Sequence, residues 1–390
     1  MARLNELSKN YSLNALKIAA VGDMAFVGRY ENINGPNPLT LLAKTFAQYD
    51  LVIGNLECPL TLEGQSVPGK CTLRGNPLWA PKLQQAGVNV LSLANNHLMD
   101  YGKDGLLNTI DHLNQSGIQW LGAGRNSEEA LAPLVIDANG SKIALVARSS
   151  VFVASPSYAD LQTPGIARFD LQETTATLKS CRLHADIVIL LLHWGIEHYR
   201  YPTPSQRKLA KNLISAGADF IIGHHPHVLQ GIEYIEGGAV AYSLGNFLFD
   251  HFTWRFTNND GDLQENNMRL TPMQREAGLL TLEKEKGSSF SIGFIPTRIE
   301  DNTLVSRDIT PHRQMDMPRL SVPFRWPAYG LFWRIYSLER EFRIRILPLV
   351  RGKLSWEKFK HIRTRHFLQL FKTLRRSVGI TGGRNTNPYE

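Results

Sequence analysis

The sequence predicts a mixed-sheet α/β sandwich, and two observations lead to this fold class. Between residues 15 and 300, short apolar runs typical of buried strands alternate with segments of helical spacing. Later strand-like segments follow one another without helices between them, at 239–244, 278–282 and 290–294. Since the first pattern favours parallel strands and the second antiparallel ones, we expect sheets that contain both. With 43% apolar residues in 390, the chain can bury a large core.

Four helices are expected within this region, at 38–48, 78–86, 103–116 and 203–216. The last has the clearest signals, because Pro204 suits a first helical turn and Gly217 suits the position just beyond a helix end. The stretch 254–275 is polar and Asn-rich, and we expect it to be a long loop near the functional site.

The positive charge of the chain belongs to its C-terminal part. Residues 318–390 contain 16 Lys and Arg against 4 Asp and Glu, a net charge of +12, whereas the rest contains 27 against 31. Prolines interrupt the sequence from Pro311 onward. We therefore expect a main domain at 15–310 and a basic extension at 311–390. No nucleic-acid-binding motif accompanies the charge, which argues against nucleic acid as a partner.

The extension has the pattern of a basic amphipathic helix. From Trp356 to Val378, apolar residues recur at helical spacing with Lys and Arg between them, a pattern compatible with lying on an anionic membrane surface. The segment 324–350 adds Trp and Tyr among arginines. The alternative is that both helices pack their apolar sides on the main domain and merely expose the charge.

The cysteines and the N-terminal residues indicate the cellular compartment in which the protein is expected to act. The three cysteines are far apart and form no C-x-x-C pattern, which indicates a reducing compartment. Residues 1–14 show no apolar core of a signal peptide, and no run of about 18 apolar residues occurs in the chain. We expect a cytoplasmic protein. The basic extension suggests that it could also attach peripherally to the inner face of the membrane.

The stretch 223–227, Gly-His-His-Pro-His, is the strongest candidate for a functional site. It follows an apolar run at 219–222 that reads as a buried strand. Neutral imidazole is the commonest protein ligand of transition metals, and the proline stiffens the turn that carries the three rings. The alternative is a hydrogen-bonded histidine loop without metal.

Four further apolar strands also end in polar residues. Because ligands of open α/β sheets bind beyond the carboxyl ends of the strands, such ends can converge on one site. The residues that follow these strands are Asp23, Glu57, Asn95-Asn96-His97 and His193.

Each of these residues has an ordinary structural explanation when taken alone. Asp23 could cap a helix, Glu57 could be a solvent-facing acid, and His193 could be a core histidine. Together they match the bridging carboxylate, imidazoles and amide that two divalent ions about 3.5–4 Å apart require. Asn95 and Asp100 are expected to orient the imidazole of His97.

The ordered combination of these motifs resembles the CapA family, which acts in bacterial capsule biosynthesis or poly-γ-glutamate synthesis. The motifs that carry the resemblance are Asp23, Asn55-Leu56-Glu57, Ala94-Asn95-Asn96-His97 with Asp100-Tyr101-Gly102, His193-Trp194-Gly195 with Glu197, Gly223-His224-His225-Pro226-His227 and Tyr242-Ser243-Leu244-Gly245-Asn246-Phe247. This family is similar to calcineurin-like metallophosphoesterases. That similarity implies a four-layer α-β-β-α sandwich, with two sheets between helices.

The resemblance also implies a set of site residues. Two divalent ions, Mn, Fe or Zn, are expected, with Glu57 as the bridge and His97 as the acid beside Asp23 and Glu57. The implied metal ligands are Asp23, Glu57, Asn96, His193, His225 and His227. The residues expected to line the substrate pocket are Asn95, Arg148, Glu197 and Asn246, and those expected to support the ligands are Asp100 and His224.

The sequence departs from the phosphatase pattern at two positions. Phosphatases carry a histidine two residues after the first aspartate, and this chain has Ala25 there. Glu57 stands where they carry an aspartate. One of the two ions therefore lacks a ligand.

Two functions remain open on these grounds. The first is a metal-dependent hydrolase that cleaves a phosphoester or a γ-glutamyl amide of an anionic capsular polymer or poly-γ-glutamate. The second is a non-catalytic subunit that binds the polymer while the extension recruits a capsule synthase at the membrane. Neither a glycine-rich phosphate loop nor a Ser-His-Asp arrangement is visible, which argues against ATP-driven ligation by this chain.

Overall fold

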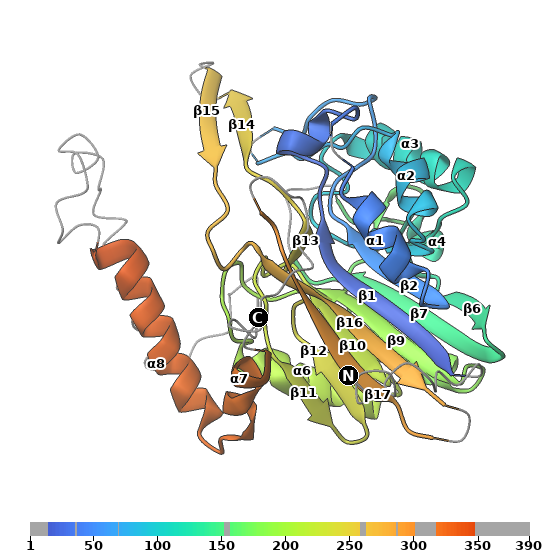
Figure 1. The fold of residues 1–390 in the computed structure, drawn as a ribbon, viewed down its shortest axis with the longest axis vertical. Helices are drawn as coiled ribbons and strands as arrows, with labels where there is room; N and C mark the ends of the chain where they lie inside the picture. The colour runs from blue at the N-terminus through green and yellow to red at the C-terminus, as the bar shows by residue number, and fades with distance from the viewer. Residues whose placement is uncertain are drawn as a thin grey trace, which may run out of the picture.

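Two mixed β-sheets lie face to face between layers of helices (Figure 1). The computed structural model describes residues 15–35, 37–68, 70–151, 157–257, 263–285, 288–300 and 317–347. Both sheets contain parallel and antiparallel strands, as the sequence predicted.

The first sheet has four parallel strands and two antiparallel ones on one side of β1. Its order is β17 (Ser291–Arg298), β16 (Glu276–Lys284), β1 (Leu16–Met24), β2 (Leu51–Leu56), β3 (Val90–Ser92) and β4 (Gln119–Leu121). The short strand β13 (Asn246–Leu248) runs parallel to the end of β1 and pairs Asn246 with Asp23.

The second sheet has four parallel strands in the middle and an antiparallel strand at each edge. Its order is β11 (Ile232–Ile235), β12 (Gly238–Ala241), β10 (Phe220–His224), β9 (Ile187–His193), β7 (Ser141–Ser149) and β6 (Leu134–Ala138). Two small pairs complete the described strands: β5 (Ala123–Gly124) with β8 (Gly165–Ile166), and β14 (Phe252–Thr257) with β15 (Leu263–Met268).

Alternation of side chains along the strands separates the core into layers. On β1, Ile18 and Ala20 point between the sheets, while Ala19 and Val21 point toward the helices of the first sheet. Those helices are α1 (Leu39–Phe46), α2 (Trp79–Gln85) and α3 (Gly102–Gln115), and α5 (Leu171–Arg182) and α6 (Pro204–Ser215) cover the second sheet. The four-layer α-β-β-α sandwich is therefore confirmed.

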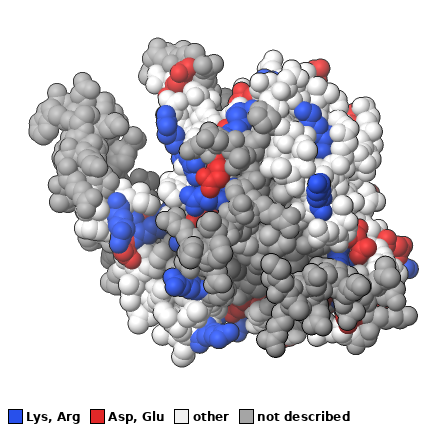
Figure 2. Space-filling view, in the orientation of Figure 1, with Lys and Arg blue, Asp and Glu red and all other residues white. Residues whose placement is uncertain are grey.

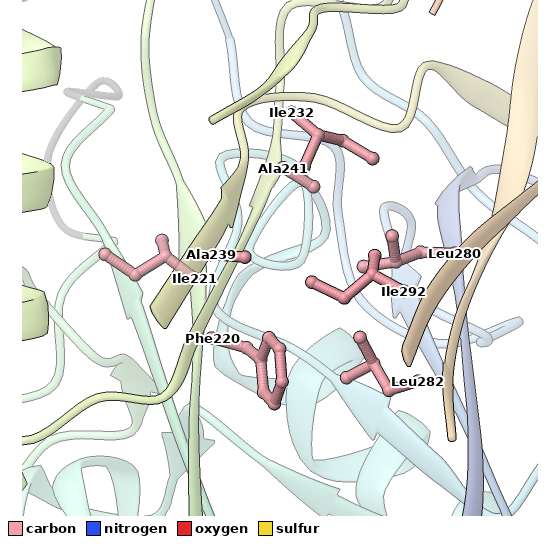
Figure 3. A pocket seen from close by; sticks show the side chains of 8 residues that line it. All are labelled: Phe220, Ile221, Ile232, Ala239, Ala241, Leu280, Leu282 and Ile292. Carbon is pink, nitrogen blue, oxygen red and sulfur yellow. The ribbon is translucent and has the colours of Figure 1, made fainter. Parts of the chain in front are cut away.

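The space between the sheets is apolar away from the strand ends. Figure 3 shows side chains of the second sheet, such as Phe220 and Ala241, facing Leu280, Leu282 and Ile292 of the first. All side chains that line this part of the molecule are hydrophobic. It is part of the packed interior and offers no group for binding or catalysis.

Helix α6 begins where the sequence predicted. Pro204 is its first residue, and Thr203 and Gln206 form a reciprocal capping box that satisfies two otherwise unpaired backbone donors. This helix packs Leu213 against the second sheet. It also lies beneath Gly195, since a Cβ atom there would come within 2.7 Å of the Gln206 side chain.

Several elements differ from the expectation. The stretch 254–275 is not a loop throughout, because β14 and β15 form an antiparallel hairpin that extends from the body (Figure 1). Strand β15 is mainly polar, but β14 alternates Phe252, Trp254 and Phe256 with polar residues, a strand signal that the expectation of a loop passed over. Strands β6 and β7, helix α5, and the short α4 (Ser127–Leu131) and η1 (Gly28–Glu31) were also not expected.

The start of the C-terminal extension packs on the second sheet. It comprises α7 (Met317–Ser321), η2 (Val322–Arg325), α8 (Tyr329–Glu341) and the π-helical turn η3 (Phe342–Ile346). Tyr329 is 4% exposed and donates a hydrogen bond to the Pro202 carbonyl at 2.7 Å, while the Arg207 guanidinium lies 4.2 Å from its ring. Part of the apolar surface of 317–347 therefore packs on the main domain, while Leu331 and Ile335 of α8 are exposed. The expected helix at 356–378 lies outside the described residues.

The surface of the described part carries both signs of charge. Figure 2 shows Lys and Arg scattered over the viewed face, with acidic groups between them. Within the described ranges, none of the helices combines the length and the apolar character that crossing a membrane requires.

Helix α8 should depend on Tyr329 for its docking. Tyr329→Ala removes a buried ring and its hydrogen bond, and we expect it to lower the free energy of opening of α8 by about 3 kcal/mol. Hydrogen exchange of the α8 amides measures this quantity directly. Leu331→Ala, at a position 60% exposed on the same helix, is the matched control and should change it by less than about 0.5 kcal/mol. Equal effects of the two substitutions would contradict the packing described above.

Candidate metal centre

The carboxyl ends of strands from both sheets meet at one place. Asp23 lies near the end of β1, Glu57 follows β2, and His193 ends β9. The two sheets are joined directly there, because the backbone N–H of His225, just after β10, donates to Asp23 Oδ2 at 3.3 Å. All these side chains are buried. The convergence expected from the strand ends is therefore present.

Three groups of side chains bring their ligand atoms within 4.8 Å of one another. The groups are Glu57, His193 and His225; Asp23, Glu57 and His227; and Glu197, His225 and His227. Asn96 extends the first group, since its Oδ1 lies 2.7 Å from His193 Nε2. Glu57 belongs to two groups, with its Oε1 3.5 Å from the Nε2 atoms of both His193 and His227.

Glu57 provides the test of whether a cation fits this arrangement. Its side chain is 0% exposed, and neither carboxylate oxygen has a hydrogen-bond partner in the structure. Burial raises the pKa of the Glu57 carboxyl well above its ordinary value, and the neighbouring Asp23 raises it further. An ionised carboxylate in this environment is strongly unfavourable unless a cation neutralises it, and without a cation the group favours its protonated form. The donor set, carboxylate and imidazole, is suited to Mn, Fe or Zn.

The imidazoles of the site are held in the form that binds metals. Burial lowers the pKa of His193 well below its ordinary value, and that of His225 to about 4. Both rings are therefore neutral at physiological pH, as coordination requires. One buried nitrogen of each ring, Nδ1, has no hydrogen-bond partner.

The backbone around these rings is strained and tightly packed. His225 and His227 have φ angles of 95° and 56°, which are uncommon for residues other than glycine and cluster at functional sites. The preceding strands approach their neighbours closely at two glycines. A Cβ atom added at Gly22 would lie 2.0 Å from the carbonyl oxygen of Gly245. One added at Gly223 would lie 2.0 Å from the carbonyl oxygen of Tyr242.

His97 lies beside the ligand groups and has its own supporting network. Its Nδ1 is 2.7 Å from Asp100 Oδ2, which also accepts a hydrogen bond from the Leu73 N–H at 2.7 Å. Lys70 Nζ contacts the other Asp100 oxygen and donates to the Asn96 carbonyl at 2.6 Å. Asp100 therefore lies where it can orient the imidazole of His97, as the sequence predicted. Lys70 was missed, because a lysine in an irregular segment has no sequence signal that links it to Asp100.

Asn95 supports the loop and does not line a pocket. Its side chain is 0% exposed, accepts hydrogen bonds from the N–H groups of His97 and Leu98, both at 3.1 Å, and donates to the Leu56 carbonyl at 2.7 Å. This corrects the expectation that Asn95 contacts substrate. Asn55, which was not singled out as a site residue, donates to Asp23 Oδ1 at 2.9 Å and so fixes that carboxylate.

Arg148 faces away from the metal centre, which corrects the expectation that it lines the pocket. Ser149, the next residue on β7, pairs with His193, and neighbouring strand residues point to opposite faces. The Arg148 side chain accordingly lies on the side of helix α5, where its Nη2 bonds Glu173 Oε1 at 2.7 Å. It is 0% exposed and serves as a buried ion-pair partner.

Asn246 and His224 support other groups of the centre. Asn246 Oδ1 lies 2.8 Å from His227 Nδ1, and its amide donates to the Gln274 carbonyl at 3.0 Å, so it orients His227 rather than facing substrate. His224 Nε2 lies 3.2 Å from the Val21 carbonyl and joins the two sheets. Glu197, expected in the substrate pocket, is exposed and lies with His225 and His227 in the third group.

Because Ala25 has no donor atom, the group of Asp23, Glu57 and His227 has one ligand fewer than the other metal position. The first group offers four donors, Glu57, Asn96, His193 and His225, whereas Asp23, Glu57 and His227 offer three. Ala25 is fully buried among apolar side chains, and its N–H pairs with the Leu248 carbonyl at 2.7 Å. It therefore belongs to the packing of β1 and β13.

Sequence comparison assigns the family. The model of the family described as bacterial capsule synthesis protein PGA_cap matches residues 17–251, the region that contains nearly all of the candidate site. This chain belongs to that family, and the resemblance to CapA proteins is confirmed.

Curated relatives match over part of their length. The capsule biosynthesis protein CapA of Bacillus anthracis is 35% identical over 209 residues, covering 52% of this chain and 51% of the relative. The PGA biosynthesis protein CapA of Bacillus subtilis is 34% identical over 250 residues, covering 62% of this chain and 65% of the relative. The chain thus spans about half to two thirds of the length of these relatives.

Solved structures show distant likeness. The NAD nucleotidase of Haemophilus influenzae has a TM-score of 0.42 at 14% identity, covering 84% of this chain and 60% of that protein. A putative 5′-nucleotidase of Staphylococcus aureus has a TM-score of 0.44 at 15% identity, covering 78% of this chain and 57% of that protein. Values this low say nothing about the reaction.

A substitution of Glu57 should affect the metal-free and metal-loaded protein in opposite directions. Glu57→Gln removes a buried charge, so we expect it to raise the free energy of unfolding of the chelator-treated protein by about 1–3 kcal/mol. With metal at 100 times its Kd, the wild type should instead gain about 2.7 kcal/mol that the variant lacks.

Denaturant unfolding with and without Mn²⁺ measures both effects. The control is Glu63→Gln, which makes the same chemical change at an exposed position. If Glu57→Gln destabilised the metal-free protein as much as the metal-loaded one, Glu57 would be a structural residue and not a metal ligand.

Proposed function

We propose that this chain is a divalent-metal-dependent hydrolase that acts in the synthesis or processing of an anionic capsular polymer, poly-γ-glutamate being the first candidate. The observation that carries the proposal is the Glu57 carboxylate, buried without a partner and shared by two groups of metal-binding side chains. A shared carboxylate of this kind is what two adjacent cations need as a bridge.

The proposed ligands divide into two positions. Glu57, Asn96, His193 and His225 would hold one ion, and Asp23, Glu57 and His227 would hold the other. When bound, such ions supply a water-derived nucleophile near neutral pH and polarise the oxygen of the scissile group. The residues around them fix the ligands: Asn55 holds Asp23, and Asn246 holds His227.

His97 is the proposed general acid. The Asp100 carboxylate accepts a hydrogen bond from Nδ1–H of His97, which fixes the tautomer and leaves Nε2 to exchange a proton with the leaving group. Lys70 and the Leu73 N–H hold the carboxylate in turn. His97 is partly exposed, as a group that meets a substrate must be.

The substrate class rests on the family and its relatives. Membership of the PGA_cap family, and the names of the two Bacillus relatives, support a polymer such as poly-γ-glutamate. The bond cleaved would be a γ-glutamyl amide or a phosphoester. We keep 15–310 as the catalytic unit and 311–390 as an extension that brings it to a capsule synthase or to the membrane.

The alternative is a non-catalytic polymer-binding subunit, which Ala25 favours because it removes one expected ligand. Elemental analysis of the purified full-length chain, with His225→Ala beside it, separates the two. About two equivalents of Mn, Fe or Zn that are lost in the variant would support the hydrolase. No bound metal after supplementation with each ion would leave the assembly subunit.

His97→Ala should separate catalysis from metal binding. We expect it to keep the metal content of the wild type and to lower kcat by about 10²–10⁴-fold, the usual contribution of a general acid. The measurement is hydrolysis of p-nitrophenyl phosphoesters and of poly-γ-glutamate by the metal-loaded protein. His184→Ala, an exposed histidine before β9, is the control and should leave the rate unchanged. Loss of metal in His97→Ala would contradict this role.

A further inference from the structure

We propose that Glu197 is a ligand of the metal position formed by Asp23, Glu57 and His227, where it takes the place of the side chain missing at Ala25. The inference rests on the metal centre of the proposed function and specifies which residue completes it. Its basis is the third group of ligand atoms, in which a Glu197 oxygen lies within 4.8 Å of nitrogens of both His225 and His227.

The number of donors assigns Glu197 to this position. The position of His193 and His225 already has four donors when Asn96 is included. The other has three, one fewer than the four that transition-metal sites of this kind commonly use. Glu197 raises it to four. Ala25 cannot contribute, because it is buried in the apolar core and carries no donor atom.

The loop that carries Glu197 is fixed to the histidine loop. The N–H of His198 donates to the Pro226 carbonyl at 2.7 Å, and Pro226 lies between His225 and His227. Gly195 and His198, on either side of Glu197, have φ angles of 93° and 64°. These left-handed conformations turn the chain back toward the histidines, and strain of this kind persists only where the surroundings enforce it.

Residues behind the loop hold it in place. Arg340 Nε on helix α8 donates to the His198 carbonyl at 3.1 Å, and the Gln274 amide lies 2.8 Å from His198 Nε2. The Arg200 N–H donates to the Tyr336 hydroxyl at 2.8 Å. The position of Glu197 is therefore set by the scaffold before a cation binds, as a ligand position should be.

Nothing else in the described part of the chain accounts for this carboxylate. No hydrogen bond or ion pair is recorded for the Glu197 side chain within these ranges, although it faces two imidazoles. Glu197 is exposed, whereas Asp23, Glu57 and His193 are buried. Glu197 would therefore be the solvent-facing ligand of a position whose other ligands, Asp23, Glu57 and His227, are buried.

Titration with Mn²⁺ alone tests the proposal. The full-length wild-type chain should bind two equivalents of unequal affinity, and electron paramagnetic resonance should show spin coupling between them. Glu197→Gln should keep the tighter equivalent and weaken the other by about 10–100-fold or more, with the spectrum of an isolated Mn²⁺ ion. Glu197→Asp should restore part of the affinity, because it keeps the carboxylate.

Two comparisons make the result specific. Asp23→Asn should weaken the same equivalent as Glu197→Gln, whereas His193→Ala should weaken the other one. Glu63→Gln, at an exposed position away from the ligand groups, should change neither. Circular dichroism checks that each variant is folded.

The outcomes separate this inference from the proposed function. If Glu197→Gln still bound two equivalents of Mn²⁺ with unchanged affinity, the inference about Glu197 would be wrong, but the proposed function would stand. Loss of both equivalents in that variant would also overturn the inference, because Glu197 would then act on the whole centre. A single equivalent in the wild type would mean that Ala25 is not compensated. A wild-type chain that binds no Mn²⁺, Fe²⁺ or Zn²⁺ would overturn both proposals.

Discussion

The arrangement of this molecule around its site depends on one buried carboxylate. Glu57 sits between the two sheets at their carboxyl ends, and no protein group neutralises it or donates a hydrogen bond to it. The desolvation of such a group opposes folding, so the protein tolerates it only if something else compensates. Burial keeps His193 and His225 uncharged, so they do not supply the charge. Without a cation the Glu57 carboxyl favours its protonated form, as its raised pKa indicates, and a bound metal ion would take the place of that proton. This is why metal binding and stability should be linked in this chain.

Bringing both sheets to one point imposes a second constraint on the backbone. The strands that deliver Asp23 and His224 each carry a glycine immediately before the polar residue, and at both glycines a Cβ atom would overlap a neighbouring carbonyl oxygen. The hydrogen bond from the His225 N–H to Asp23 crosses between the sheets at this level. Close approach of the backbones is therefore the condition under which ligands from different sheets can share an ion. The left-handed conformations of His225 and His227 also help to bring their rings to the meeting point of the two sheets.

Sequence reasoning picked out the candidate ligands because they follow uninterrupted apolar strands, where the fold itself brings them together. It failed where the side-chain direction mattered. Arg148 was expected to line the substrate pocket, but a strand turns successive side chains to opposite faces, and Arg148 points to helix α5. The β14–β15 hairpin was missed although β14 alternates apolar and polar residues, because β15 is mainly polar and the stretch as a whole was taken for a loop. Lys70 acts through Asp100 across an irregular segment, and such a contact is visible only in three dimensions.

The C-terminal extension is connected to the site through the loop of Glu197. Helix α8 contacts this loop from behind: Arg340 bonds the His198 carbonyl and stacks on the Tyr199 ring at 4.2 Å, and the Tyr199 hydroxyl donates to Glu341 at 2.9 Å. The opposite side of α8 exposes apolar residues such as Leu331 and Ile335. Helix α8 is thus bonded to the backbone next to Glu197. Because the His198 N–H also donates to the Pro226 carbonyl, between His225 and His227, a shift of α8 would be passed through this loop to candidate ligands of both metal positions.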